Sequence, residues 1–277
     1  MFQSQRIPGA IAILFAVSLM ASPATADDFD TCGNGSGAQA IAACDRVIAN
    51  PRTSVVNRAA TYDNRGNLYD DQGDHDRALA DYNEAIRLNP KNSIAYNNRG
   101  NAYDDKGDLA HAIADYNEAI RLNPKYDQAY ENRGVAYLYS GNLAKALADV
   151  SQASKLDPKH AYHALWVDIV APRSNVPSRV SDAILKIDMT KWPAPIIRMF
   201  LGQMTPAAVL AAAEDPEAQK KKSQVCEANF YGGELALRQG SKDEAARLFR
   251  LAATDCPYSD MERHAASQEL KALGATE

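Results

Sequence analysis

Four cysteines have the most readily interpreted chemistry in this 277-residue sequence, namely Cys32, Cys44, Cys226 and Cys256. An even number of cysteines in an oxidising compartment predicts disulfide bonds, and four cysteines can pair in three ways. A metal site is the competing interpretation. It is the weaker one, because the cysteines form no CxxC motif and no histidine pair accompanies them at ligand spacing.

The histidines and acids form no recognisable enzyme motif. His160 and His163 lie three residues apart and could bind a metal ion together, but no third ligand is evident in the sequence. Neither a Gly-x-Ser-x-Gly motif nor a phosphate-binding loop occurs. Neighbouring acids such as Asp70 and Asp71 lack an apolar setting that would raise one pKa for acid catalysis. We therefore expect no catalytic residue, no metal and no cofactor, and a hydrolase is the least favoured function.

A repeat of 34 residues organises the centre of the chain. The string Ala-Asp-Tyr-Asn-Glu-Ala-Ile-Arg-Leu-Asn-Pro occupies 80–90 and returns unchanged at 114–124, and a looser copy follows at 148–158. Upstream of each copy lies Tyr-x-x-Arg-Gly-x-x-Tyr-x-x-x-Gly, which begins at Tyr62, Tyr96 and Tyr130. A sustained period of this length resembles the tetratricopeptide repeat (TPR), whose unit is a pair of antiparallel helices.

The residue types within one unit explain such a helix pair. Tyr96, Gly100 and Tyr103 have the i, i+4, i+7 spacing of one helix face, and Gly100 lets a neighbouring helix approach closely. Gly107 can adopt the left-handed conformation that ends the first helix, and Asp108 then caps the second. Because one pair cannot bury its apolar stripe alone, several pairs must stack. We predict an all-α fold, a right-handed superhelical solenoid of antiparallel helix pairs.

Residues 1–26 are predicted to be a signal peptide. Arg6 precedes an apolar stretch at 11–21, and Ala24-Thr25-Ala26 supplies a small-residue cleavage pattern. The stretch is shorter than the about 20 residues that a membrane-spanning helix needs. Cys32 lacks the preceding motif of a lipid-attachment site. We expect a mature protein that begins near Asp27 and is exported to the periplasm of a bacterial envelope, with no membrane span and no lipid anchor.

The rest of the chain divides into four predicted regions. These are an N-terminal half-repeat or cap at 27–51, three repeats at 52–158 (about 57–90, 91–124 and 125–158), a degenerate helical region at 159–215, and a C-terminal TPR-like repeat with a capping helix at 216–277. Short helices are expected in the degenerate region at 160–170, 180–187, 194–201 and 207–213, separated by prolines, and a final helix is expected at 260–273.

This division favours the two local cysteine pairings over the third arrangement. Cys44 takes the buried position that Tyr116 fills in a full repeat, and Cys32 in the glycine-rich lead-in could close the half-repeat. Cys226 opens the first helix of the C-terminal repeat and Cys256 closes the second. An antiparallel hairpin brings those two ends together, so a Cys226–Cys256 bond is geometrically natural.

The first helices of a TPR solenoid line its concave surface, which is where such proteins bind partners. Positions beside the Tyr/Gly packing stripe are acidic or amide-bearing in the first two repeats and partly apolar in the third, which suggests a partner segment with basic and apolar residues. Plain solvation of these side chains is the alternative. The predicted groove residues are Asp63, Asn64, Asn67, Asp70, Asp71, Asn97, Asn98, Asn101, Asp104, Asp105, Glu131, Asn132, Val135, Leu138 and Tyr139.

Asn64, Asn98 and Asn132 recur before each Arg-Gly, and their amides could bind a peptide backbone. Some TPR proteins instead grip a free C-terminal carboxylate with lysines and asparagines. Where that clamp needs a cation, this chain has Asp63 and Asn97, so this mode of binding is disfavoured.

The later landmarks resemble a particular family. His163-Ala164-Leu165-Trp166, then the segment from Trp192 to Gly202, then Asn229-Phe230-Tyr231-x-Gly233 follow the order seen in the NlpI-type TPR lipoproteins of bacterial envelopes. The resemblance implies a non-enzymatic, homodimeric adaptor that brings peptidoglycan hydrolases to a periplasmic protease. The missing lipidation cysteine is a departure from that family.

The charge of the chain argues against nucleic acid as a partner. The net charge is −5, and the only basic run, Lys220-Lys221-Lys222, is typical of a solvated helix face, so nothing indicates nucleic acid as a partner. We therefore interpret the protein as a periplasmic scaffold or adaptor that binds proteins or peptides in its groove. The alternative is a structural homo-oligomer of the cell envelope.

Overall fold

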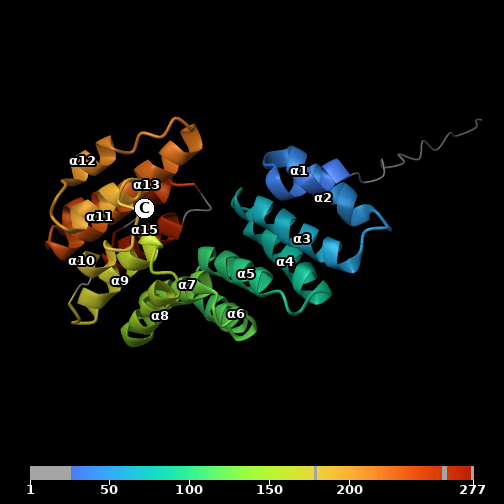
Figure 1. Cartoon of the computed structure of the whole chain (residues 1–277), viewed down its shortest axis with the longest axis horizontal. Helices are drawn as coiled ribbons and strands as arrows, with labels where there is room; N and C mark the ends of the chain where they lie inside the picture. Colours follow the sequence, from blue (N-terminus) through green and yellow to red (C-terminus); the bar gives the residue numbers. More distant parts are fainter. Residues whose placement is uncertain (1–25, 178–179, 258–260, 276–277) are drawn as a thin grey trace, which may run out of the picture.

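The computed structural model describes residues 26–177, 180–257 and 261–275, and these residues form fifteen helices and no strand (Figure 1). The predicted all-α fold of stacked helix pairs is confirmed. The predicted signal peptide, apart from Ala26, lies outside the described residues. No helix of the described chain has the length and apolar character needed to cross a membrane.

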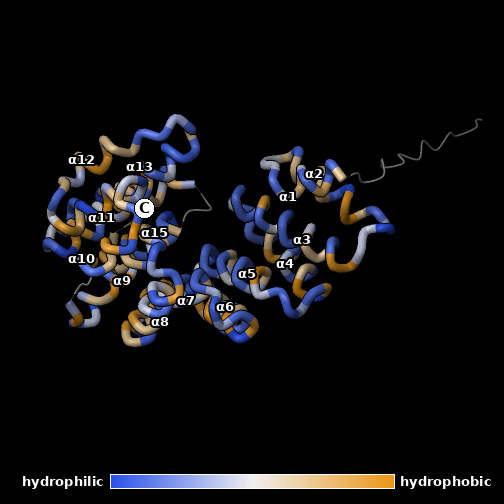
Figure 2. The backbone as a smooth tube through the Cα atoms, in the orientation of Figure 1, coloured by the Kyte–Doolittle hydropathy of each residue, from blue (hydrophilic) through white to orange (hydrophobic). Residues whose placement is uncertain are grey.

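The first eight helices form four consecutive pairs along an arc (Figure 1). They are α1 (Ala26–Asn34) with α2 (Gly37–Ala49), α3 (Val55–Asp70) with α4 (His75–Leu88), α5 (Ser93–Asp105) with α6 (Leu109–Leu122), and α7 (Asp127–Tyr139) with α8 (Leu143–Leu156). The other helices are α9 (Ala161–Arg173), α10 (Val180–Ala183), α11 (Ala194–Phe200), α12 (Pro206–Ala211), α13 (Ala218–Arg238), α14 (Lys242–Asp255) and α15 (Met261–Ala272). Hydrophilic and hydrophobic residues alternate along most of these helices, a pattern typical of helices that bury one face (Figure 2).

Glycine sets the close packing within each pair. A Cβ atom on Gly100 would lie 2.6 Å from the ring of Tyr116, which is closer than carbon atoms can approach. Gly107 has a φ angle of 76° and ends α5, while the carboxylate of Asp108 accepts a hydrogen bond from the backbone N–H of His111 and caps α6. These are the roles that the sequence predicted for the three residues.

A buried ion pair explains the arginine of each Arg-Gly motif. The guanidinium of Arg99 donates two hydrogen bonds of 2.7 Å to Asp115 on the partner helix of the same repeat. It donates a third, of 2.6 Å, to Asn83 in the preceding repeat. One side chain therefore joins three helices and fixes the stacking of successive units. The same bidentate pair recurs in the neighbouring repeats as Arg65–Asp81 and Arg133–Asp149.

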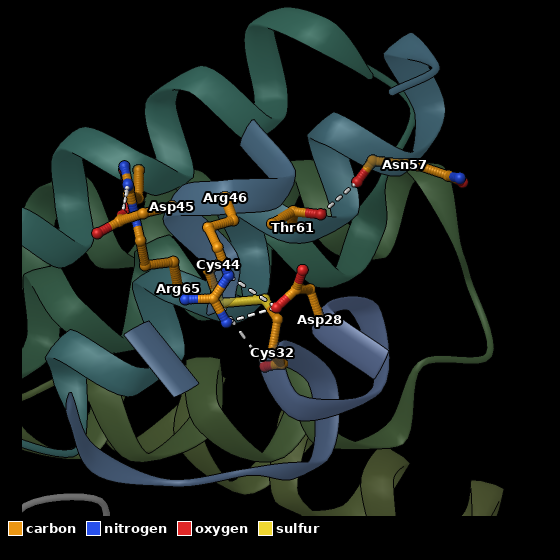
Figure 3. Close-up of a disulfide and its surroundings, with 9 residues drawn as sticks. Asp28, Cys32, Cys44, Asp45, Arg46, Asn57, Thr61 and Arg65 are labelled. Atoms are coloured by element: carbon orange, nitrogen blue, oxygen red, sulfur yellow. Dashed lines mark hydrogen bonds and ion pairs between the residues drawn. A yellow bond between two sulfur atoms is a disulfide. The ribbon is translucent and has the colours of Figure 1, made fainter. Parts of the chain in front are cut away.

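The N-terminal unit differs from the predicted half-repeat. The lead-in to Gly37 is helical up to Asn34, so α1 packs on α2 and completes a pair. Cys32 and Cys44 form a disulfide bond whose Cα atoms are 4.9 Å apart, and Arg46 on α2 donates to Asp28 on α1 beside it (Figure 3). This clamp matters because the local core is small, and a loop of this length contributes about 3 kcal/mol in chain-entropy models.

The C-terminal helices share the largest hydrophobic core of the described chain, centred on Trp166, Phe230 and Phe249. Cys226 and Cys256 form the second disulfide bond, with Cα atoms 5.0 Å apart. Two expectations need correction. Cys226 lies well inside α13, which begins at Ala218 and packs as one long helix, and α10 ends at Ala183 rather than at residue 187.

A buried arginine joins the C-terminal helices to one another. Arg173 on α9 donates to Glu234 on α13 and to Glu269 on α15, each at 2.6 Å. Both carboxylates are almost fully buried. The positive charge of this guanidinium therefore compensates for the loss of water around them. The pair of bonds fixes the position of α15, the last helix, relative to α9.

Candidate binding pocket on the concave face

A cavity of about 230 Å³ lies among the first helices of the three repeats and the start of α15. It is lined mainly by α3 and α5, with Val135 of α7 on one side and Met261 and His264 of α15 on another. Most of the predicted groove residues from the first two repeats meet here. The predicted residues that line the cavity are Asn67, Asp70, Asp71, Asn98, Asn101, Asp104, Asp105, Asn132 and Val135.

A ladder of amides crosses the cavity wall from repeat to repeat. Asn132 donates one hydrogen bond to Asn97 and another to Asn101 in the preceding repeat, at 3.1 and 2.9 Å. Asn98 donates in the same way to Asp63 and Asn67, at 3.3 and 3.1 Å. An amide nitrogen has two hydrogens, so both donors of Asn98 and Asn132 are engaged within the protein. Asn98 and Asn132 therefore align successive repeats. Only the side-chain oxygen of each amide is left to accept a hydrogen bond from a ligand.

Asp104 is the most unusual residue of the cavity. Its Oδ1 atom is buried and has no hydrogen-bond partner. Burial, and secondarily the neighbouring charge of Asp105, raises the pKa of Asp104 to about 8. The ring of His264 lies beside this carboxyl, with Nε2 3.6 Å from Oδ1 of Asp104 and 3.0 Å from the amide nitrogen of Gln268. The separation from Oδ1 exceeds hydrogen-bonding distance.

Asp105 extends the acidic character to the edge of the cavity. Burial and the charge of Asp70 raise the pKa of Asp105 to about 7, while His75 and Arg263 oppose the rise. His75 already has a hydrogen-bond partner within the protein, because its Nδ1 lies 2.7 Å from Oδ1 of Asp70. Asp70, His75 and Asp105 also place three ligand atoms within 4.8 Å of one another, the separation at which they could share a cation.

Three predicted groove residues of the first two repeats lie outside the cavity wall. Asp63 is buried, and burial raises its pKa to about 6 although the hydrogen bond from Asn98 opposes the rise. Asn97 is buried as an acceptor of the amide ladder. Asn64 faces α1, since a Cβ atom on Gly33 would lie 3.5 Å from its Nδ2.

Apart from Val135, the third repeat does not present the apolar groove surface that the sequence suggested. Leu138 is only 6% exposed and packs in the main core, and the hydroxyl of Tyr139 is buried. Glu131 is buried beside His163. These residues are covered because the chain after 160 folds over the concave side of α7, which periodicity within the repeat cannot reveal.

The residues of α15 in the cavity wall are the ones that the sequence did not anticipate. The last helix was expected only to cap the end of the array, yet Met261 and His264 lie against the second repeat. No local motif marks either residue. Their position results from the accumulated curvature of all the intervening units.

Comparison with known families agrees with this architecture. Residues 64–127 match one family model described as tetratricopeptide repeat, and residues 127–160 match another with the same description. Residues 64–160 are tetratricopeptide repeats. Such repeats generally mediate protein–protein interaction and bind peptides, and the fold is typical of non-enzymatic scaffolds. Comparison of the sequence with curated proteins gives no match.

Several solved TPR structures are similar to part of the chain. The first TPR of Spaghetti (RPAP3) bound to the HSP90 peptide SRMEEVD is 28% identical, with a TM-score of 0.43, and the match covers 43% of this chain and 98% of that one. The Arabidopsis OM64 TPR domain is 24% identical, with a TM-score of 0.42 and coverage of 44% and 100%. The first TPR domain of human RPAP3 is 27% identical, with a TM-score of 0.41 and coverage of 47% and 94%.

Proposed function

We propose that this protein is a non-enzymatic scaffold that binds a segment of a partner protein in the concave cavity. The observation that carries the proposal is the buried carboxyl of Asp104, whose Oδ1 has no hydrogen-bond partner in the wall of a cavity. A buried polar group without a partner is costly, so such a group is normally retained where a ligand supplies the missing partner.

The lining of the cavity indicates the chemistry of the segment. Asp70, Asp104 and Asp105 converge on one side, and a lysine or arginine side chain would satisfy them through charge-assisted hydrogen bonds. Val135 and Met261 supply an apolar wall beside the acids. The preferred ligand is therefore a basic residue next to an apolar one. An acidic C-terminal peptide would meet like charges here.

The setting that we propose is the bacterial periplasm. It rests on the cleavage pattern at the start of the sequence and on two disulfide bonds, which persist in oxidising compartments. The resemblance to the NlpI-type adaptors supports a role in linking a periplasmic protease to peptidoglycan hydrolases. In this role the protein acts as a homodimer, and neither a cofactor nor a nucleic acid takes part.

Calorimetric titration with a short peptide of alternating arginine and leucine tests the cavity. Asp104→Asn combined with Asp105→Asn keeps the shape of the two side chains and removes their charge, and should weaken binding about tenfold or more. Asp243→Asn, at an exposed position of α14 away from the cavity, is the matched control and should bind like the wild type. Equal affinities for all three proteins would contradict the proposed site.

Crosslinking from an envelope extract then tests the adaptor role. The wild-type protein should capture proteases and wall hydrolases, and the double asparagine variant should lose them. Capture of further copies of the chain alone, by both proteins equally, would instead support the structural homo-oligomer.

A further inference from the structure

Four potential metal ligands meet at the junction between the third repeat and α9. Asp127 and Glu131 lie one turn apart on α7, and His160 and His163 lie at the start of α9. Nε2 of His163 is 3.4 Å from Oε2 of Glu131 and 3.7 Å from Oδ2 of Asp127. One ligand atom from each of Glu131, His160 and His163 lies within 4.8 Å of the others. Glu131 thus adds a third ligand to the pair His160 and His163, and Asp127 lies close to His163.

Three atoms of this cluster are buried polar atoms without a hydrogen bond. They are Oε1 of Glu131, Nδ1 of His160 and Nε2 of His163. His163 is fully buried and Glu131 is 5% exposed, so bulk solvent does not reach these side chains. Buried polar atoms are normally hydrogen-bonded, and each exception needs a reason. The residues that hold these three atoms are also the three whose ligand atoms lie within 4.8 Å of one another, so one ion bound among them offers a common reason.

The second nitrogen of His163 is held in the way that metal-binding histidines require. Its Nδ1 lies 3.4 Å from the carbonyl oxygen of Asp157, which can only accept a hydrogen. A ring that donates from Nδ1 has the lone pair of Nε2 available toward Glu131 and Asp127. Metal-ligating histidines commonly donate their other nitrogen to a backbone carbonyl or carboxylate, which fixes the tautomer.

A simple ion pair is the competing explanation. Burial lowers the pKa of His163, but the carboxylates of Glu131 and Asp127 raise it by more, so the net shift favours the imidazolium. A proton on Nε2 would satisfy that nitrogen alone. It would leave Oε1 of Glu131 and Nδ1 of His160 without a partner, whereas one cation bound among the three residues would give each of them a ligand bond.

We propose that this cluster binds one divalent transition-metal ion, with Zn²⁺ as the favoured ion and with the ligands Glu131, His160 and His163, while Asp127 lies beside His163 at the open side of the site. Imidazole and carboxylate together suit zinc and its neighbours in the first transition row. Ligand distances near 2.1 Å in a tetrahedron place donor atoms about 3.4 Å apart. The separation of 3.4 Å between His163 and Glu131 fits this geometry, and the partly exposed Asp127 leaves a route for the ion. Bound there, the ion fastens α9 to α7.

The Asp70–His75–Asp105 group provides an internal comparison. Its three members are all partly exposed, and His75 already has a hydrogen bond to Asp70. None of its ligand atoms is a buried atom without a partner. The junction cluster should therefore be the tighter of the two sites.

Equilibrium dialysis of the full chain against Zn²⁺, after chelator treatment, tests the proposal with the metal measured directly. The wild type should bind one equivalent, and Co²⁺ in its place should give the visible absorption of a tetrahedral nitrogen–oxygen site. His160→Ala and Glu131→Gln should each weaken binding at least tenfold, because each removes a ligand. His75→Ala, in the comparison group, and His111→Ala, at an exposed position of α6, should bind like the wild type.

Two results would overturn the proposal. One is a wild-type protein that binds no Zn²⁺ under these conditions. The other is loss of binding in His75→Ala with retention in Glu131→Gln, which would assign the ion to the other group. Circular dichroism confirms the fold of each variant. If His160→Ala does not fold, the Zn²⁺ binding of the isosteric Glu131→Gln variant alone tests the proposal.

Discussion

Nε2 of His264, on the last helix, lies 3.6 Å from Oδ1 of Asp104, on the first helix of the second repeat. The chain therefore curves far enough for α15 to reach the concave face of its own repeats. His264 occupies the side of the cavity from which a basic side chain of a partner would approach Asp104. The imidazole and a bound lysine or arginine thus compete for one carboxyl.

This competition predicts that His264→Ala tightens the binding of the arginine–leucine peptide. The variant enlarges the cavity and removes the ring whose Nε2 lies 3.6 Å from Oδ1 of Asp104. A contact of this kind contributes up to about 1 kcal/mol when the imidazole is protonated, so affinity should rise by about threefold. Calorimetry measures the change, and His111→Ala, an exposed histidine on α6, is the control. Weaker binding by His264→Ala would show that the imidazole belongs to the binding site.

The buried Arg99–Asp115 pair should dominate the stability of the second repeat. Asp115→Ala leaves the guanidinium of Arg99 half-buried without its carboxylate and should lower the free energy of unfolding by about 2–3 kcal/mol. Glu118→Ala on the same helix removes the exposed pair with Arg121 and should cost less than about 0.5 kcal/mol. Urea denaturation compares the two variants. Similar losses in both would mean that the buried pair does not hold the repeats together.

Asp63 should make the stability depend on pH. Burial raises its folded-state pKa to about 6, above its ordinary value of 3.8, so the unfolded chain loses this proton first as the pH rises. The free energy of unfolding therefore falls by about 3 kcal/mol between about pH 4 and pH 6, and Asp63 causes no further change at higher pH. Asp63→Asn should remove the loss, because its amide oxygen still accepts the hydrogen bond from Asn98.

Thermal unfolding at several pH values measures this effect. The Asp63→Asn variant should match the wild type near pH 4 and exceed it in stability at pH 7. Asp243→Asn, at an exposed position, should follow the wild type throughout. Equal curves for wild type and Asp63→Asn would mean that Asp63 titrates normally in the folded protein.

The repeats could be predicted from the sequence because their determinants are local. Gly100 and Tyr116 recur with the period of the unit, and one unit already contains both members of the contact. The position of α15 could not be predicted, because it depends on small rotations summed over many helix pairs. For the same reason the register of the repeat places Asp104 on the concave face, whereas no sequence pattern predicts that His264 lies beside it.

The candidate metal ligands also could not all be predicted from the sequence, although they lie closer together in the chain than Asp104 and His264. His160 and His163 stand out because they are close in sequence, but Glu131 belongs to the preceding repeat and shares no motif with them. Leu138 also follows the groove register of its repeat, yet the helices after 160 bury it. Register within a repeat identifies the face on which a residue lies, and only the fold shows what covers that face.

Two adjacent glycines of α13 provide the sharpest test of the packing. A Cβ atom on Gly233 would lie 2.6 Å from the ring of Phe249, whereas one on Gly232 would lie 3.5 Å from Leu248, an ordinary contact. Gly233→Ala should therefore destabilise the protein by about 1–3 kcal/mol through overpacking. Gly232→Ala should stabilise it by up to about 1 kcal/mol, because alanine favours helix. Thermal unfolding distinguishes them, and a gain in both variants would mean that Phe249 moves aside freely.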